Sequence, residues 1–249
     1  MARSHKYPFP IAQSKPQSMV TESYRTLRTN IQFANALHDS SVILVTSALA
    51  GEGKTSTAVN LAIVSAQAGK RVVVIDADLR NPQVHVHLRV PNEAGLSSLL
   101  IKETCLEKVL SATDMTGLYV LSGGPVPTNP SEILSSMEFQ DVVLQCRNQF
   151  DLVIIDSPPL LAVSDPVVVI RVVDGIILVI SAKKTHRSSA QQAISIIQQV
   201  NGRILGGVLN RVSKGIKTYS YHQAALAPPK IVQPLPDRKS VDLAKQSIQ

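Results

Sequence analysis

A stretch of ten residues, SALAGEGKTS at positions 47–56, contains the groups that proteins use to hold the phosphates of a nucleotide. Its glycines let backbone N–H groups turn toward an anion, Lys54 can bridge the outer phosphates, and the Thr55 hydroxyl can bind Mg²⁺. The residues that we expect against the nucleotide are Gly51, Glu52, Gly53, Lys54, Thr55 and Ser56. The stretch therefore predicts a site for ATP together with Mg²⁺.

The first position of this phosphate-binding loop departs from the common pattern G-x-x-x-x-G-K-[ST]. Ala48 stands where the pattern has glycine, which removes freedom to turn the backbone but none of the phosphate ligands. The loop follows the β-branched run SVILVT and precedes an Ala-rich stretch that begins at Lys54. Because a phosphate loop requires this order of strand, loop and helix, we expect it to be functional despite the substitution.

Three carboxylates stand at the ends of two other apolar runs. VVVIDADLR places Asp76 and Asp78 directly after one run, and LVIIDSPP places Asp156 after another. Strand ends that meet at the edge of the phosphate loop would turn these acids toward the phosphates. We expect Thr55, Asp76 and Asp156 to hold Mg²⁺. Catalysis is expected of Lys54 and of the pair Asp76 and Asp78, one of which serves as the general base.

The elements that must position these groups alternate between short apolar runs and longer amphipathic segments. The strand candidates are SVILVT, RVVVID, GLYVLS, FDLVIID, GIILVIS and RILGGVLN, and the helix candidates are residues 54–68, 131–150 and 187–200. The runs are apolar throughout, as strands covered on both faces must be. This rhythm predicts an α/β fold of the P-loop NTPase type, with a doubly wound, mostly parallel sheet and helices on both faces.

The positive charge of the chain is concentrated at its ends. The 249 residues carry a net charge of +7, to which residues 1–30 contribute +4 and residues 211–249 contribute +5. We expect flexible basic tails at residues 1–20 and 213–249, on either side of a domain at residues 21–212. With 4% aromatic residues and no basic folded body, the chain lacks the composition of a nucleic-acid binder. Basic tails suit an anionic membrane surface or an acidic partner.

Targeting and redox signals favour the cytoplasm. The chain has no apolar run close to the roughly 20 residues that span a bilayer, and no apolar stretch follows its basic N-terminus. Cys105 and Cys146 have neither metal-ligand spacing nor the pattern of a disulfide framework.

The order of the motifs points to a known family. The phosphate loop, the acidic motif VVVIDADLRNP and the segment FDLVIIDSPP together resemble the bacterial tyrosine kinases of capsular and exopolysaccharide biosynthesis, the BY-kinase family. GLSSLL, LSGGPVPTNPSEILSS, SDPVVVIRVVDGIILVI and GGVLNRV are similar to that family in order and spacing. The resemblance implies an ATP-dependent protein-tyrosine autokinase. It also implies a transmembrane activator that holds the kinase at the inner face of the cell membrane, and an opposing tyrosine phosphatase.

The resemblance assigns roles to residues outside the phosphate loop and its acids. ESYRTLR matches the family's E-x-x-R-x-x-R subunit-contact motif through Glu22, Arg25 and Arg28. Residues at this spacing share one helical face, and the family's contact closes a ring-like homo-oligomer. Asn210 and Arg211 stand at the end of the last strand candidate, at the place where related folds recognise adenine.

The C-terminal tyrosine cluster that the family implies is thin in this chain. KTYSYHQ provides Tyr219 and Tyr221, and no tyrosine follows them. Because they lie in a polar, basic segment just beyond the last strand candidate, we expect these two to be the autophosphorylation sites. A second departure is Ala50, where the family usually has proline, which softens the loop without deleting a ligand.

Two other functions fit the same motifs. Partition and septum-positioning ATPases share the fold without phosphorylating protein, but they carry a signature lysine early in the loop, where this chain has Leu49. A nucleotide-dependent scaffold for polysaccharide export, with negligible turnover, would not need the intact Lys54 and its three acids. The missing signature lysine, the ESYRTLR segment and the tail tyrosines favour the kinase, and the partition-type ATPase is the main alternative.

Overall fold

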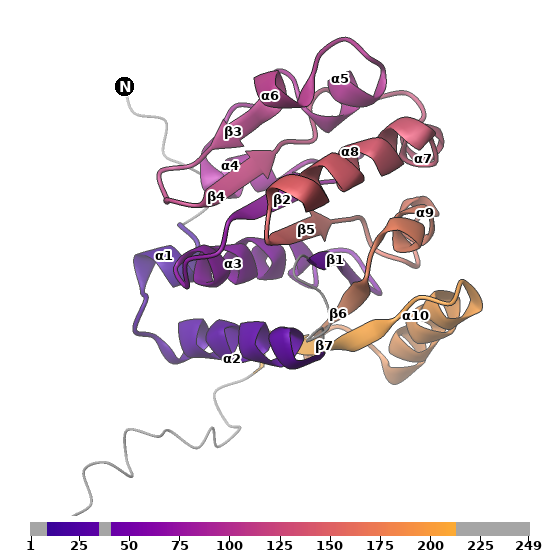
Figure 1. The fold of residues 1–249 in the computed structure, drawn as a ribbon. Helices are drawn as coiled ribbons and strands as arrows, with labels where there is room; N and C mark the ends of the chain where they lie inside the picture. Colours follow the sequence, from indigo (N-terminus) through magenta and orange to yellow (C-terminus); the bar gives the residue numbers. More distant parts are fainter. Residues whose placement is uncertain (1–8, 35–40, 213–249) are drawn as a thin grey trace, which may run out of the picture. The chain divides into compact units, whose positions relative to one another are not determined.

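The described residues of the computed structural model, 9–34 and 41–212, build one sheet covered by helices on both faces (Figure 1). Its strands are β1 (Ser41–Ser47), β2 (Val72–Asp76), β3 (Leu110–Ala112), β4 (Leu118–Leu121), β5 (Leu152–Asp156), β6 (Gly175–Ser181) and β7 (Ile204–Asn210). Their order in the sheet is β3-β4-β2-β5-β1-β6-β7, and every pair is parallel except β3 with β4. The predicted α/β fold with a mostly parallel sheet is confirmed.

Helices connect the parallel strands and separate into two layers (Figure 1). They are α1 (Ile11–Ser14), α2 (Met19–Ala34), α3 (Lys54–Ala66), α4 (Val84–Leu88), α5 (Leu96–Leu100), α6 (Leu106–Val109), α7 (Pro130–Leu134), α8 (Met137–Gln149), α9 (Asp165–Val169), the 3-10 helix η1 (Ile170–Val172) and α10 (Arg187–Gln199). In the part of the chain that the structure describes, no helix is long and apolar enough to cross a bilayer.

The central strands supply two separate hydrophobic cores, one on each face of the sheet. Val42 and Leu44 of β1 pack in the core that includes Phe139 of α8, whereas Ile43 and Val45 pack in the core that includes most of α3. The side chains of all four of these β1 residues are fully buried. Successive side chains of a strand point to opposite faces, so a strand covered on both faces must be apolar at every position. This requirement explains the unbroken apolar runs of the sequence.

Two elements differ from the sequence prediction. Residues 131–150 form two helices, α7 and α8, because Ser136 begins a new helix, and its hydroxyl oxygen accepts a hydrogen bond from the Phe139 N–H at 3.3 Å. The strand β3 was not predicted, because three residues are too few to show a period. The helices expected over residues 54–68 and 187–200 are present and end one or two residues early.

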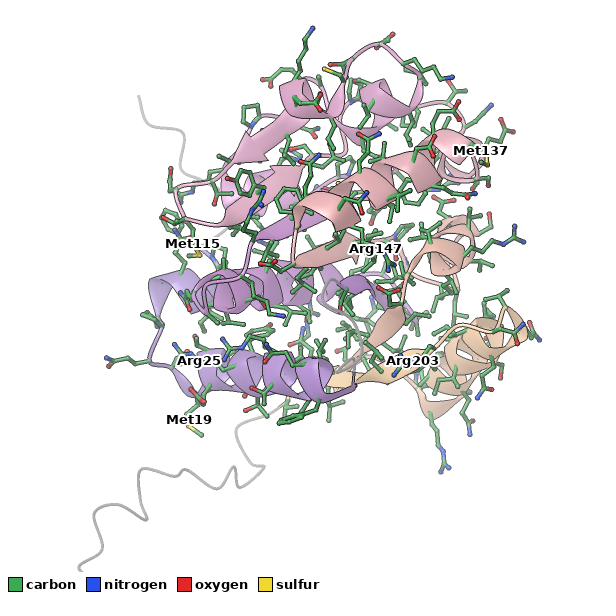
Figure 2. The ribbon with its side chains drawn as sticks, viewed as in Figure 1. Met19, Arg25, Met115, Met137, Arg147 and Arg203 are labelled. Atoms are coloured by element: carbon green, nitrogen blue, oxygen red, sulfur yellow. The ribbon has the colours of Figure 1, made fainter. Side chains whose placement is uncertain are left out.

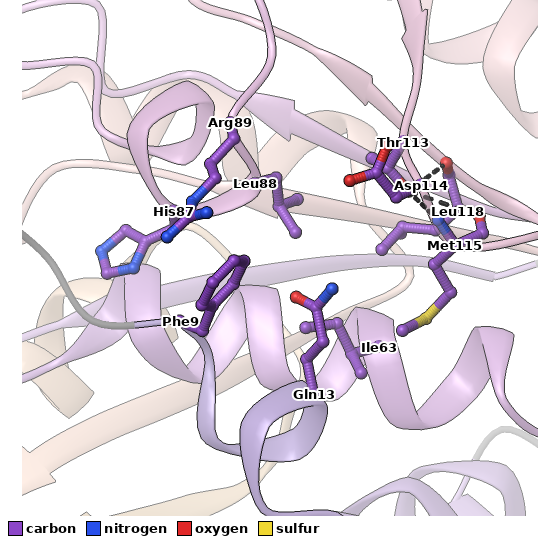
Figure 3. A pocket seen from close by; sticks show the side chains of 10 residues that line it. All are labelled: Phe9, Gln13, Ile63, His87, Leu88, Arg89, Thr113, Asp114, Met115 and Leu118. Atoms are coloured by element: carbon purple, nitrogen blue, oxygen red, sulfur yellow. Dashed lines mark hydrogen bonds between the residues drawn. The ribbon is translucent and has the colours of Figure 1, made fainter. Parts of the chain in front are cut away.

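The N-terminal segment is packed from Phe9 onward, which differs from the extended arm expected over residues 1–20. Ala12 of α1 is fully buried, and its N–H donates a hydrogen bond to Oδ1 of Asn60 in α3 at 2.8 Å. Figure 3 shows the ring of Phe9 facing the guanidinium of Arg89, whose central carbon lies 3.3 Å from the ring centroid. Residues 1–8, 35–40 and 213–249 lie outside the described residues, so the limits of the two predicted tails stay a prediction.

We predict that Asn60→Leu lowers the thermal stability of the protein. The side chain of Asn60 is nearly buried, and the leucine would leave the buried N–H of Ala12 without an acceptor, at a cost of about 1–3 kcal/mol. For a chain of this size, each kcal/mol lowers Tm by about 2–4 °C. Circular dichroism during heating measures the change. Asn148→Leu, at an exposed site of α8, is the control and should leave Tm almost unchanged; an equal loss in both variants would contradict the anchoring role of Asn60.

Candidate active site

The carboxyl ends of neighbouring strands bring the predicted residues together at one edge of the sheet. In the register of β2 and β5, Asp76 lies directly opposite Asp156. On the other side of β5, Val45 of β1 is paired with Asp156, and the phosphate loop follows β1 at Ser47. Asp78 lies two residues beyond the end of β2. The parallel order of these three strands therefore places the loop beside all three acids.

The loop between β1 and α3 uses glycine only where the backbone requires it. Gly51 and Gly53 have φ angles of 77° and 96°, the left-handed region that favours glycine. A Cβ at Gly53 would also stand 2.1 Å from Nδ2 of Asn210. Ala48 is fully buried and is not among the described residues with positive φ. Alanine thus serves at the first position of the loop because the backbone there does not enter the region that needs glycine.

The side chain of Glu52 is buried and holds the loop in place. Its Oε2 accepts a hydrogen bond from the Leu49 N–H at 2.8 Å, and its Oε1 accepts one from the Thr185 hydroxyl. Its backbone carbonyl accepts a hydrogen bond from Nδ2 of Asn210 at 2.9 Å. The carboxylate of Glu52 therefore faces the protein interior, and its predicted place against the nucleotide stays a prediction that concerns its backbone. Asn210 braces the loop from β7, and Arg211 beside it is exposed.

Lys54, the first residue of α3, forms the central ion pair of the site. Its Nζ lies 2.7 Å from Oδ2 of Asp78, and both side chains are largely buried. Burial alone would lower the pKa of the Lys54 ammonium, but the charges of Asp156 and Asp78 outweigh it, so the pKa is raised. Lys54 therefore stays protonated and can neutralise either these carboxylates or incoming phosphates.

Asp76 is held by backbone groups. Its Oδ2 accepts hydrogen bonds from the N–H groups of Gln83 and Val84, both at 2.9 Å, which fixes the start of α4 against the end of β2. Burial raises the pKa of the Asp76 carboxyl to about 8; repulsion from Asp156 and Asp78 adds to the effect, and the two backbone hydrogen bonds offset only part of it. The surroundings of Asp76 therefore disfavour its ionised form.

Asp156 completes the set of acids and has an oxygen without a partner. The hydroxyl of Thr55 forms a hydrogen bond with its carboxylate, but Oδ1 is buried and has no hydrogen-bond partner. Burial raises the pKa of Asp156 to about 6, although the Lys54 charge and the Thr55 hydroxyl favour the ionised form. Because buried polar atoms are rarely left without a partner, this carboxylate oxygen is a candidate ligand for a cation.

The donors at this point fit Mg²⁺. The ion prefers oxygen ligands, and the Thr55 hydroxyl and the unpaired Oδ1 of Asp156 are oxygens beside the loop, with Asp76 directly across from Asp156. Within the described residues, no group of three or more His, Cys, Asp or Glu side chains forms a complete metal site. This agrees with the usual binding of Mg²⁺ through one or two carboxylates and the phosphates of a nucleotide.

The predicted subunit-contact residues do not all share one exposed face. Glu22 and Arg25 form an ion pair at 2.9 Å on the surface of α2, where Figure 2 labels Arg25. Arg28 instead turns inward, and its Nη1 donates a hydrogen bond to the carbonyl of Val64 near the end of α3 at 2.7 Å. Arg28 is half-buried and bonded within its own chain, and the subunit contact through the three residues stays a prediction. The tail residues Tyr219 and Tyr221 lie outside the described residues.

The loop after β6 contacts the phosphate loop, which was not predicted from the sequence. The Nζ of Lys184 donates a hydrogen bond to the carbonyl of Ala50 at 2.8 Å, next to the Thr185 contact with Glu52. The signal was available in principle, because AKKTH follows a strand candidate and so must reach the same edge of the sheet as the phosphate loop.

A second missed contact involves Arg80. Its Nε and Nη2 donate hydrogen bonds to the two carboxylate oxygens of Asp165 at 2.8 and 3.0 Å. This bidentate pair fastens the segment after Asp78 to α9. No local sequence pattern indicates it.

The fold and this site define a P-loop nucleotide-binding protein. A family model for an AAA domain matches residues 40–208. The chain is 42% identical to tyrosine-protein kinase YwqD of Bacillus subtilis over 80% of this chain and 84% of that protein. It is 36% identical to putative tyrosine-protein kinase CapB of Staphylococcus aureus over 84% and 92%, respectively. The solved kinase domain of Escherichia coli tyrosine kinase ETK is 34% identical, with a TM-score of 0.78 over 89% of this chain and 87% of that one. The chain belongs to the family of bacterial tyrosine-protein kinases.

The partition-type alternative shares the fold only. The septum site-determining protein MinD of Pyrococcus horikoshii, solved with Mg-ADP, is 21% identical, with a TM-score of 0.62 over 74% of this chain. The relatives with higher identity are kinases, so the resemblance seen in the sequence is confirmed and the kinase interpretation is favoured over the ATPase.

We predict that the nucleotide-free protein loses stability as pH rises from 6 to 8. The folded pKa values of Asp76 and Asp156 lie above the unfolded value of about 4, so the folded state binds more protons in this range. The stability from these protons is complete below about pH 4 and is lost as pH rises through about 6 and 8. Thermal unfolding with EDTA at each pH measures the loss.

Asp156→Asn removes one charge of the pair and should flatten this dependence. Asp141→Asn changes an exposed acid of α8 and is the control, which should keep the slope of the wild type. An identical slope in all three proteins would show that the buried acids do not repel each other.

Proposed function

We propose that this chain is an ATP-dependent protein-tyrosine autokinase that regulates the polymerisation and export of a capsular polysaccharide or exopolysaccharide. The observation that carries the proposal is the Lys54–Asp78 ion pair at 2.7 Å beside the opposed carboxylates Asp76 and Asp156. Membership of the tyrosine-protein kinase family supports the choice of a tyrosine hydroxyl as the acceptor.

The residues of the site have different roles in phosphoryl transfer. Gly51, Gly53 and Lys54 hold the phosphates, and Thr55, Asp76 and Asp156 would hold Mg²⁺, which neutralises phosphate charge when bound. The tyrosine oxygen forms a bond to the terminal phosphorus while the bond from that phosphorus to the ADP oxygen breaks. The phenolic proton passes to the carboxylate of Asp76 or Asp78, which acts as general base. Asp78 can accept it once Lys54 turns from the carboxylate to the phosphates.

The proposal includes partners that follow from the family. We expect a transmembrane activator of the chain-length-determinant type to hold the kinase at the inner face of the cell membrane, and a tyrosine phosphatase to reverse the modification. The acceptors are Tyr219 and Tyr221, which lie within residues 211–249, a segment with a net charge of +5. Each phosphate adds about −1.5 to −2, which weakens the attraction of this segment to acidic surfaces. No nucleic-acid partner is proposed.

We predict that Lys54→Met abolishes both ATP hydrolysis and phosphotyrosine formation. The variant removes the ammonium that neutralises the phosphates, and it also leaves Asp78 without its partner. Incubation with Mg²⁺-ATP and the cytoplasmic segment of the activator, followed by mass spectrometry, measures the modification. A control variant, Lys70→Met, changes an ordinary lysine beyond the end of α3 and should label like the wild type.

The same experiment locates the phosphate. Label on Tyr219 and Tyr221, and its loss in the Tyr219→Phe/Tyr221→Phe variant, is the expected result. A double variant that labels as strongly as the wild type would refute the tail assignment. Steady ATP hydrolysis without any phosphotyrosine would replace the kinase by the partition-type ATPase.

We predict that Glu22→Ala/Arg25→Ala weakens self-association into a ring-like homo-oligomer and leaves the folded monomer stable. Both side chains lie on the surface of α2, where they pair with each other, and Arg25 also donates a hydrogen bond to the Pro16 carbonyl. Arg28→Ala is the matched contrast, because it removes an internal hydrogen bond to Val64 and should lower Tm. Light scattering with the activator segment measures the mass. The same mass for wild type and double variant would rule out this contact.

A further inference from the structure

The phosphate loop has a single cation of its own. Lys54 is the only basic residue among positions 47–56, and it is already paired with Asp78. Asp76, Asp78 and Asp156 outnumber it at the same edge of the sheet. The terminal phosphate of ATP would add further negative charge. Phosphoryl transfer depends on positive groups that stabilise this charge, so a second cation near the loop would have a direct use.

Lys184 provides a cation at the outer side of the loop. Its Nζ donates a hydrogen bond to the carbonyl of Ala50, and it is the only atom of the described residues within 4 Å of a Cβ built on Gly51, at 3.7 Å. The ammonium therefore lies against two consecutive residues of the phosphate loop, Ala50 and Gly51. The carbonyl uses one of its three N–H donors, which leaves two for a ligand.

The backbone that carries Lys184 is fixed to the loop. The N–H groups of Lys184 and Thr185 donate hydrogen bonds to the carbonyl of Ser181 at 3.1 and 3.0 Å, which forms a turn at the end of β6. The Thr185 hydroxyl then binds Glu52 inside the loop. The lysine side chain itself is exposed. A fixed backbone that carries an exposed ammonium with two remaining donors is an arrangement suited to a group that contacts a bound ligand.

We propose that Lys184 is a second phosphate-binding residue, whose ammonium contacts the terminal phosphate of ATP and stabilises the charge on it during transfer. The inference rests on the proposed function for the identity of the nucleotide and deepens it. Lys184 acts in cis, from the loop between β6 and α10, and distinguishes ATP from ADP because only ATP has the terminal phosphate. The neighbouring Lys183 is also exposed and has no described contact with the loop.

The experiment compares the binding of ADP with that of a non-hydrolysable ATP analogue, both with Mg²⁺, in calorimetry. Lys184→Ala should weaken the ATP analogue about tenfold and change ADP affinity less than twofold. Turnover of ATP should fall about 10²–10³-fold, the usual effect of removing one group that stabilises charge in the transition state. Lys183→Ala is the matched control and should behave as the wild type. Lys184→Arg, which keeps the charge, should recover part of the turnover.

Lys184→Gln separates this role from simple bracing of the loop. Glutamine can still donate a hydrogen bond to the Ala50 carbonyl but carries no charge. We expect it to resemble Lys184→Ala in both binding and turnover. Wild-type behaviour of the Gln variant, or equal losses for ADP and the ATP analogue in Lys184→Ala, would overturn the proposal. The binding comparison needs no phosphotyrosine, so a failure of the kinase assignment would show separately, as ATP turnover without protein modification.

Discussion

The structure is organised around buried negative charge at the ends of two adjacent strands. The pairing of β2 with β5 sets Asp76 opposite Asp156, both almost without exposure to solvent. Buried charges of like sign cost several kcal/mol unless other groups compensate them. Two sets of groups compensate this charge. The ammonium of Lys54 lies at the start of α3, and backbone N–H groups at the start of α4 donate hydrogen bonds to Asp76. The starts of both helices therefore contribute to stabilising the same group of buried acids.

The phosphate loop is held from three strands at once. It leaves β1, it is tied to the loop after β6 through Glu52 and Thr185, and Nδ2 of Asn210 at the end of β7 meets the Glu52 carbonyl. The order β5-β1-β6-β7 therefore places the residues that hold the loop beside it. This support explains how the loop keeps its shape without glycine at position 48 and without proline at position 50.

Much of this arrangement could be predicted from the sequence because it depends on local rules. Apolar runs mark buried strands, and the parallel order brings their carboxyl ends to one edge, which places Lys54 near Asp76 and Asp156. The inward turn of Arg28 and the buried side chain of Glu52 could not be predicted, since each depends on a partner distant in the sequence. The contacts of Lys184 and Asn210 with the loop span 134 and 158 residues. No pattern within one segment reports such pairs.

The acceptor of the phosphate must be selected outside the phosphate loop. MinD shares the fold at 21% identity, and a fold of this kind does not by itself define a function. The segment after Asp78 is a fixed part of the structure near the acids, because Arg80 ties it to the buried carboxylate of Asp165 on α9. Because a bidentate pair fixes both distance and orientation, the segment after Asp78 is held in a defined position relative to α9. This segment does not by itself identify the acceptor, whose assignment as a tyrosine rests on membership of the tyrosine-protein kinase family.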